Sequence, residues 1–267
     1  MSAIHIPTLA PDVLFHIGGI MITNTMVNVW LALFIFLGVG LMISRKASLR
    51  PGKLQNILEY FLEILLGYFD QVTGDRIKTK RFLPLVGSIF FFILLSNWLG
   101  LLPGTGSITV GDHFLLRPAN SDLNLTVAMA LVSVIASHVF GIMAVGFFAH
   151  IGKFVQFGSL ARSFKKGPIG IFQGVIEFMV GFLEIISEMA KVLSLSLRLF
   201  GNIFAGEVLI SVIGALVAAI VPTPFMLLEI LVGLIQAAVF SMLTLVYLTV
   251  ASAEPHGESE TAHVGGH

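Results

Sequence analysis

The sequence predicts an all-α integral membrane protein with about six helices and five membrane crossings. The chain is 56% hydrophobic and only 11% of its 267 residues are charged, with a mean hydropathy of +0.97. Soluble domains carry about 25% charged residues. Apolar runs long enough to cross a bilayer recur along the chain, and basic residues gather between them.

Hydropathy over windows of about 20 residues places the elements in the first half of the chain. Residues 1–25 are expected to form an N-terminal segment outside the membrane, and residues 26–253 the membrane domain. Within this domain we expect spans at about residues 26–43, 82–102 and 123–148. The third span follows a Pro-Ala-Asn-Ser-Asp sequence that is typical of a helix start.

Residues 53–72 have a different pattern, which predicts a helix lying in the membrane interface. Acidic residues recur among leucines and other apolar residues at amphipathic spacing. These acidic residues are Glu59, Glu63 and Asp70. We therefore expect one interfacial helix in addition to the five crossings.

The C-terminal part predicts a long, steeply tilted helical hairpin. Residues 168–221 would extend roughly 80 Å as one helix, against about 30 Å of hydrocarbon. A turn at 222–224 and a return span at 225–251 follow, and residues 254–267 are expected to form a flexible cytoplasmic tail. An alternative has two spans, 168–190 and 203–221, joined by a loop. The stretch 192–200 opposes this alternative because it contains neither proline nor glycine.

Lysine and arginine residues predict the orientation of the chain. If the spans alternate, 12 of the 15 basic residues lie on one side, Lys191 and Arg198 are embedded, and Arg117 alone lies opposite. The positive-inside rule then places the N-terminus outside and the C-terminus in the cytoplasm.

Ionisable residues inside the long C-terminal segment are the strongest functional signal. A guanidinium at bilayer depth costs about 2.5–3.5 kcal/mol on insertion scales, so Arg198 needs partners or a function. At about 100° per residue, Glu184, Lys191 and Arg198 share one face, and Ser194 and Asn202 lie four residues either side of Arg198. Glu207 points roughly opposite, which suggests two compartments separated by this helix.

The return span supplies matching polar groups. Glu229 and Gln236 are seven residues apart on one face, and Tyr247 lies further along. We expect Arg198, Glu207, Glu229 and Gln236 to share one buried polar region. Glu188 and His138 are further embedded groups, and His138 is interpreted as a hydrogen-bonded packing residue rather than a relay. Asp122 and Asn124 are explained by helix capping.

The motif around Arg198 resembles the signature of subunit a of F-type ATP synthases. It runs Leu195-Ser196-Leu197-Arg198-Leu199-Phe200-Gly201-Asn202, followed by Ala205-Gly206-Glu207. Gln236-Ala237 with the following Phe240, Leu243 and 245–248 is similar to the last helix of that family, and 118–124 to the entry of its fourth helix. The similarity extends from about Arg50 to Glu254.

This resemblance implies a stator that is not catalytic by itself and faces a rotating ring of c subunits. Arg198 would face the ring carboxylate and separate two proton half-channels, with Asn202, Glu207 and Gln236 on the proton path. Glu229 occupies a position that is histidine in some bacterial members. The implied partners are the c-ring, b-type peripheral stalk subunits, the rest of the complex and lipid, without nucleic acid, cofactor or metal.

The resemblance implies a location in a bacterial plasma (inner) membrane rather than a mitochondrial one. It also implies that the coupling ion is H⁺ rather than Na⁺. Absence of a G-x-x-x-x-G-K-[ST] motif places the nucleotide chemistry on other subunits. A proton-coupled secondary transporter is the alternative, weakened by the lack of an internal repeat. An intramembrane enzyme and a purely structural subunit are weaker still. The absence of cysteine excludes disulfides and thiolate metal sites.

Overall fold

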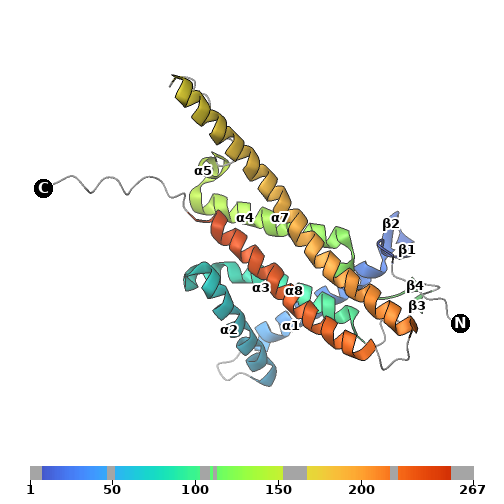
Figure 1. The fold of residues 1–267 in the computed structure, drawn as a ribbon. Helices are drawn as coiled ribbons and strands as arrows, with labels where there is room; N and C mark the ends of the chain where they lie inside the picture. The colour runs from blue at the N-terminus through green and yellow to red at the C-terminus, as the bar shows by residue number, and fades with distance from the viewer. Residues whose placement is uncertain are drawn as a thin grey trace. The chain divides into compact units, whose positions relative to one another are not determined.

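The computed structural model describes residues 8–46, 52–102, 109–110, 113–152, 167–216 and 222–253. Its elements alternate long helices with short connections, and Figure 1 labels them along the chain. The tail expected at 254–267 lies outside the described residues, as do residues 153–166, which carry four of the basic residues. The helices are α1 (Asn24–Lys46), α2 (Lys53–Thr73), α3 (Arg76–Gly100), α4 (Leu123–Val145), α5 (Phe147–Gly152), α7 (Gly167–Leu216) and α8 (Pro222–Ala251).

Five helices in the described part of the chain are long and apolar enough to cross a membrane, which confirms the predicted fold class. They are α1, α3, α4, α7 and α8. Their candidate spans of 22 to 43 residues exceed the roughly 20 needed to cross the hydrocarbon core. Helix α7 (167–216) covers most of the fourth expected crossing, and α8 covers the return span expected at 225–251.

Two short antiparallel hairpins were not predicted from the sequence. Strands β1 (Val13–Ile17) and β2 (Ile20–Thr23) pair around a turn at Gly18 and Gly19, just before α1. Strands β3 (Thr109–Val110) and β4 (His113–Phe114) pair in the connection between α3 and α4. Apolar runs this short give no strand signal that hydropathy over a membrane-length window can detect.

The expected span at 123–148 ends earlier than the sequence predicted. Helix α4 stops at Val145, and the short helix α5 follows after Gly146. Gly146 has a φ of 94°, a conformation that other residues rarely adopt. The apolar pattern continues through Phe147 and Phe148, so hydropathy alone could not detect the break.

Helix α7 is continuous from Gly167 to Leu216, as Figure 1 shows. Lys191 and Arg198 therefore lie inside a helix, and the alternative of two spans joined by a loop is wrong. The expected turn at 222–224 is also wrong, because α8 already begins at Pro222. Proline is well accommodated in the first turn of a helix, where its missing N–H has no partner to lose.

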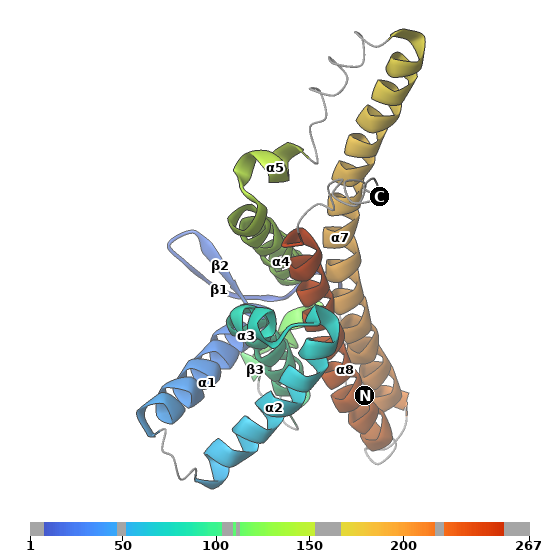
Figure 2. The same ribbon diagram turned by 90° about the vertical axis from the view of Figure 1, so that its left-hand side faces the viewer.

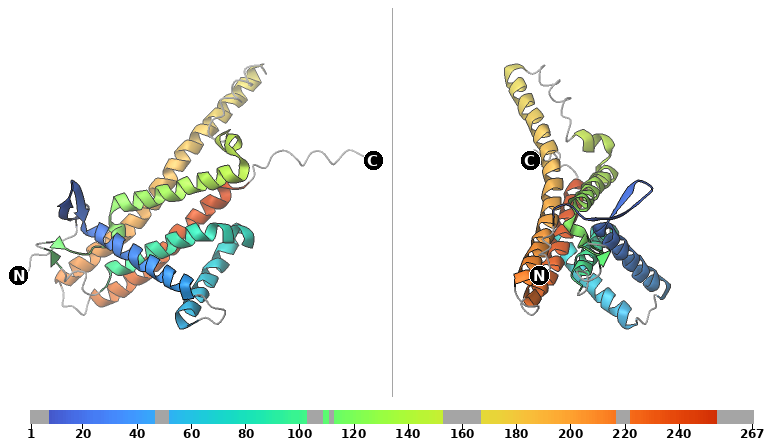
Figure 3. Two further views of the ribbon diagram at one scale, coloured as in Figure 1. Left: turned by 180° about the vertical axis from the view of Figure 1, so that it is seen from behind. Right: turned by 90° about the vertical axis from the view of Figure 1, so that its right-hand side faces the viewer.

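The chain divides into two compact units, each described here by itself. The first contains Met1–Val134 and Met189–Val246, and the second Ile135–Glu188 and Tyr247–His267. In the first unit α3 packs against both α1 and α2, which Figures 2 and 3 show from several sides. Its core includes Phe82, Val86, Phe90 and Ile93 from α3 and Leu65 and Phe69 from α2.

Helix α2 has one buried and one exposed face. Leu65 and Phe69 are buried, and the ring of Phe61 lies 5.7 Å from that of Phe90. The acidic residues Glu59 and Glu63 are exposed. The exposed face also carries the apolar residues Ile57, Tyr60, Ile64 and Tyr68. Such a surface suits a helix whose outer face meets lipid headgroups and acyl chains.

Candidate functional site

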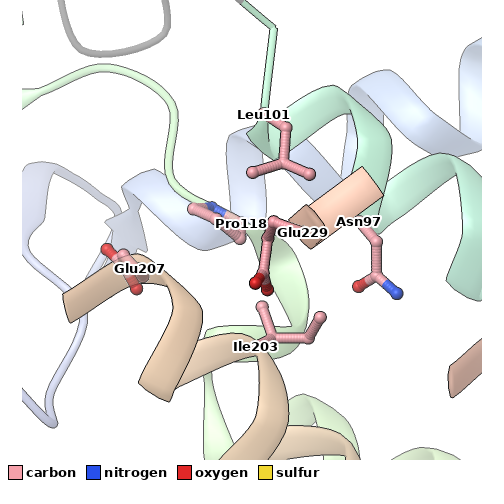
Figure 4. A pocket seen from close by; sticks show the side chains of 6 residues that line it. All are labelled: Asn97, Leu101, Pro118, Ile203, Glu207 and Glu229. Carbon is pink, nitrogen blue, oxygen red and sulfur yellow. The ribbon is translucent and has the colours of Figure 1, made fainter. Parts of the chain in front are cut away.

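A small pocket in the first unit brings together two of the carboxylates singled out in the sequence. Figure 4 shows the Glu229 carboxylate in the middle of the lining side chains, with Asn97 on one side and Glu207 on the other. Leu101, Pro118 and Ile203 complete the wall. The pocket has room for about one water molecule. Helices α3, α7 and α8 and the residues before α4 all contribute to it.

Glu229 reaches this pocket because α7 presents a glycine to it. The side chain of Glu229 is only 7% exposed, and its Oε1 has no hydrogen-bond partner within the described part of the chain. A Cβ on Gly206 would overlap the Glu229 carboxyl group. Glycine at position 206 therefore permits the close approach of α7 and α8 that places the carboxylate between them.

Glu207 forms an ion pair with Arg117. The Nε of Arg117 donates to Oε1 of Glu207 at 2.7 Å, and the two side chains are 5% and 14% exposed. Arg117 also donates to the backbone oxygens of Ala10 and Thr8 at 3.1 and 2.8 Å. Sequence reasoning missed this role, although Arg117 was the only basic residue assigned to the outer side.

Two asparagines on the other side of the pocket link α3 to α8 and to the start of α4. The Nδ2 of Asn120 donates to Oδ1 of Asn97 at 2.7 Å, and Asn97 donates to the carbonyl of Gly233 at 3.2 Å. Both asparagines are almost completely buried. Asp122 follows as the expected cap, because its Oδ1 accepts from the backbone N–H of Asn124 at 2.9 Å.

Asn202 on α7 and Gln236 on α8 are joined by a hydrogen bond, and neither residue lines the pocket. The Nδ2 of Asn202 donates to Oε1 of Gln236 at 2.7 Å. Gln236 is buried, and its Nε2 has no hydrogen-bond partner among the described residues. This amide is therefore a buried donor with unused hydrogen-bonding capacity within the described part of the chain.

Arg198 lies on an exposed face of α7 in the isolated chain. Its Nη2 is 3.5 Å from Oγ of Ser194, which is also exposed. Residues on the same face are likewise exposed within the described part of the chain: Leu197, Gly201, Asn202 and Ala205. Lys191 is half-buried one turn before Ser194. The helices in the described part of the chain thus leave the guanidinium uncovered.

The structure separates the residues that we expected to share one buried region. Glu207 and Glu229 line the same pocket, Gln236 pairs with Asn202, and Arg198 is exposed. Helix geometry explains the separation, because Glu207 comes nine residues after Arg198 and so lies on the opposite side of α7. The expected opposition of these two residues on α7 agrees with the structure.

In the second unit, Glu188 and His138 lie together. The Nε2 of His138 is 3.5 Å from Oε2 of Glu188, and its Nδ1 is 3.1 Å from Nε2 of His150. Sequence reasoning did not select His150. Glu184 and Tyr247 are half-buried in the same unit.

Comparison with known proteins gives one family. The model of the family described as ATP synthase A chain matches residues 26–249. A protein named ATP synthase subunit a from Moorella thermoacetica is 34% identical over 89% of this chain and 94% of its own length. The protein of the same name from Gloeobacter violaceus is 35% identical over 88% of this chain and 85% of its own length. ATP synthase subunit a 2 from Bradyrhizobium sp. is 31% identical over 91% of this chain and 95% of its own length.

Proposed function

The chain belongs to the ATP synthase A chain family, and we propose that it provides two proton half-channels to a rotating c-ring, with Arg198 separating them. It is a multi-pass membrane protein and a subunit of the membrane sector of the complex. It performs no nucleotide chemistry itself, which falls to other subunits of the assembly.

The exposed position of Arg198 carries this proposal. A charged residue in a membrane segment almost always faces a partner or a water-filled cavity rather than lipid. The described part of this chain leaves the Arg198 face of α7 open, and small residues there allow a helix to approach closely. A ring of helices, each carrying one carboxylate, satisfies both the charge and the shape of this face.

Two groups of polar residues supply the proton route, one in the pocket and one that reaches the Arg198 face of α7. The pocket between Glu207, Glu229 and Asn97 receives protons from outside, and the Asn202–Gln236 pair leads from α8 back to the exposed face of α7. Asn202 is exposed on that face, next to Arg198, whereas Gln236 is buried behind it. The pair therefore connects the pocket side of the helix with the ring side.

The mechanism follows from the cost of charge in lipid. A ring carboxylate is neutral while it faces hydrocarbon, because its ionised form is expensive there. At Arg198 it releases its proton to one half-channel and is held as an ion by the guanidinium. It must be reprotonated from the other half-channel before it returns to lipid. Arginine suits this position because it stays charged under all physiological conditions.

The remaining half-channel opens on the cytoplasmic side along α7, where Glu184, Glu188, Lys191 and Ser194 precede Arg198. The N-terminus lies outside and the C-terminus in the cytoplasm, in a bacterial inner membrane. Besides the c-ring, b-type peripheral stalk subunits contact the chain. Protons are the coupling ion.

The test uses membranes that contain the whole complex with Arg198→Ala. We expect ATP-driven proton pumping to be lost, while passive proton leak with the catalytic head removed persists or rises. Leu197→Ala is the matched control, since Leu197 is the exposed neighbour of Arg198 and carries no charge. Pumping at the wild-type level in Arg198→Ala would overturn the proposal. Proton uptake coupled to a solute by the chain without a ring would favour a secondary transporter instead.

A further inference from the structure

Three titratable side chains from three helices form a continuous row in the second unit. His150 of α5 contacts His138 of α4 through Nε2 and Nδ1, at 3.1 Å. The other ring nitrogen of His138, Nε2, lies 3.5 Å from Oε2 of Glu188 on α7. His138 therefore stands between the other two and contacts each through a different nitrogen.

The local backbone is shaped to bring His150 into this row. The chain turns at Gly146, where φ is 94°, and α5 returns so that His150 is only 4% exposed. Gly141 on α4 makes room for the ring, because a Cβ there would lie 2.6 Å from Cε1 of His150 and 2.9 Å from the carbonyl oxygen of Ala251. His138 and Glu188 thus come from two other helices, and the backbone carbonyl of Ala251 at the end of α8 lies beside Gly141.

A histidine that only fills space in a helix interface needs no polar partners. His138 instead has a second imidazole on one side and a carboxylate on the other. A neutral imidazole has one N–H and one acceptor nitrogen, so one histidine of the pair donates and the other accepts. When His138 carries a proton on both nitrogens, it donates to Nε2 of His150 and to the Glu188 carboxylate at the same time. The row then holds one imidazolium, one imidazole and one carboxylate.

Two proton shifts move the excess proton along the row without any other change in bonding. If the Nδ1 proton of His138 passes to Nε2 of His150, the cation moves to His150 and Glu188 stays ionised. If the Nε2 proton of His138 passes to Oε2 of Glu188, both imidazoles become neutral and Glu188 becomes a neutral acid. Each step breaks one N–H bond and forms one N–H or O–H bond.

We propose that His150, His138 and Glu188 form a proton relay that connects the cytoplasmic end of α4 with α7. The relay rests on the proposed function, because it serves the cytoplasmic half-channel. Glu188 comes ten residues before Arg198 on the continuous helix α7, or about 15 Å along its axis. The relay therefore delivers protons to the stretch of α7 that leads to Arg198, or accepts them from it.

The test compares whole complexes carrying His138→Gln, His150→Gln and Gly141→Ala with His16→Gln as control. His16 lies on the exposed hairpin strand β1 of the other unit. We expect each of the three variants to lower ATP-driven pumping at least about tenfold, which is less than the roughly 10²–10⁴-fold that general acid–base catalysis typically contributes. Gly141→Ala acts by displacing the His150 ring while keeping both histidines.

Chemical rescue separates a relay from a structural role. Imidazole added on the cytoplasmic side should restore much of the pumping of His138→Gln and His150→Gln, and leave Gly141→Ala and the control unchanged. Pumping at the wild-type level in both histidine variants would overturn the relay, as would a loss that imidazole does not restore in fully assembled complexes. The Arg198→Ala result is independent of both outcomes, so failure of the relay leaves the stator proposal intact.

Discussion

Arg117 and Glu207 form an ion pair of 2.7 Å although 90 residues separate them in the sequence. The pair joins the segment before α4 to the second half of α7. Through Ala10 and Thr8, the same guanidinium also holds the N-terminal segment before β1. One residue therefore ties three distant parts of the chain to the wall of the pocket that contains Glu229.

Replacement of Arg117 by glutamine should destabilise the complex. Removal of one partner from a buried ion pair costs about 3–5 kcal/mol, and somewhat less here because Glu207 is partly exposed. We expect a lower thermal midpoint for release of this subunit from the purified complex. In the double variant Arg117→Gln with Glu207→Gln, the loss should be smaller than the sum of the single losses, since no unpaired carboxylate remains. Additive losses would show that the two residues act independently.

Gly206→Ala should separate α7 from α8 at the pocket. The added methyl group meets the Glu229 carboxyl group, and overpacking of this kind costs about 1–3 kcal/mol. We expect reduced thermal stability together with reduced ATP-driven pumping. Gly214→Ala on the same helix is the control, because a Cβ there meets only Pro222 Cγ at 3.8 Å, an ordinary contact. Equal behaviour of the two variants would contradict the close approach of the helices.

Much of the membrane architecture could be predicted because it depends on composition and helical period alone. Apolar length predicted the five candidate spans, and the spacing of Arg198 and Glu207 predicted their opposite positions on α7. The break after α4 could not be predicted, since it depends on the φ of Gly146 inside an apolar run. The start of α8 at Pro222 was missed because proline can either end a turn or begin a helix.

Contacts between residues that are far apart in the sequence could not be predicted either. The charge of Arg117 was evident, but its contact with Glu207 depends on how the start of α4 meets α7. His150 gave no sequence signal, because it belongs to a six-residue helix whose direction is set by Gly146. The grouping of Gln236 with Asn202 rather than with Glu229 likewise depends on the register between α7 and α8. Such registers are determined by side-chain packing that no periodicity in one segment records.

Gln236→Leu should impair pumping more than Gln236→Glu. Leucine removes the acceptor for Asn202 and leaves its amide without the 2.7 Å hydrogen bond, whereas glutamate retains an acceptor oxygen at the same place. We expect both variants to assemble and the leucine variant to pump at least several-fold more slowly. The measurement is the initial rate of ATP-driven acidification of vesicles, normalised to the amount of assembled complex. Equal rates for the two variants would exclude the hydrogen bond as the relevant contribution of Gln236.

The corner between α2 and α3 should lose stability in acid through Asp70, which lies outside the candidate spans. A hydrogen bond with Thr79 and the adjacent Arg76 guanidinium lower the pKa of Asp70 below its ordinary value of 3.8. A carboxylate with a lowered pKa in the folded state stabilises that state above the ordinary value, and the contribution is lost as the pH falls below 3.8.

Hydrogen exchange of the last turn of α2 should therefore be faster in Asp70→Asn than in the wild type at neutral pH. The difference should shrink as the pH falls below 3.8, where the wild-type carboxylate also becomes neutral. Glu63→Gln, which changes an exposed carboxylate on the same helix, is the control and should match the wild type at both pH values. A difference between Asp70→Asn and the wild type that does not change with pH would assign the effect to side-chain shape rather than to charge.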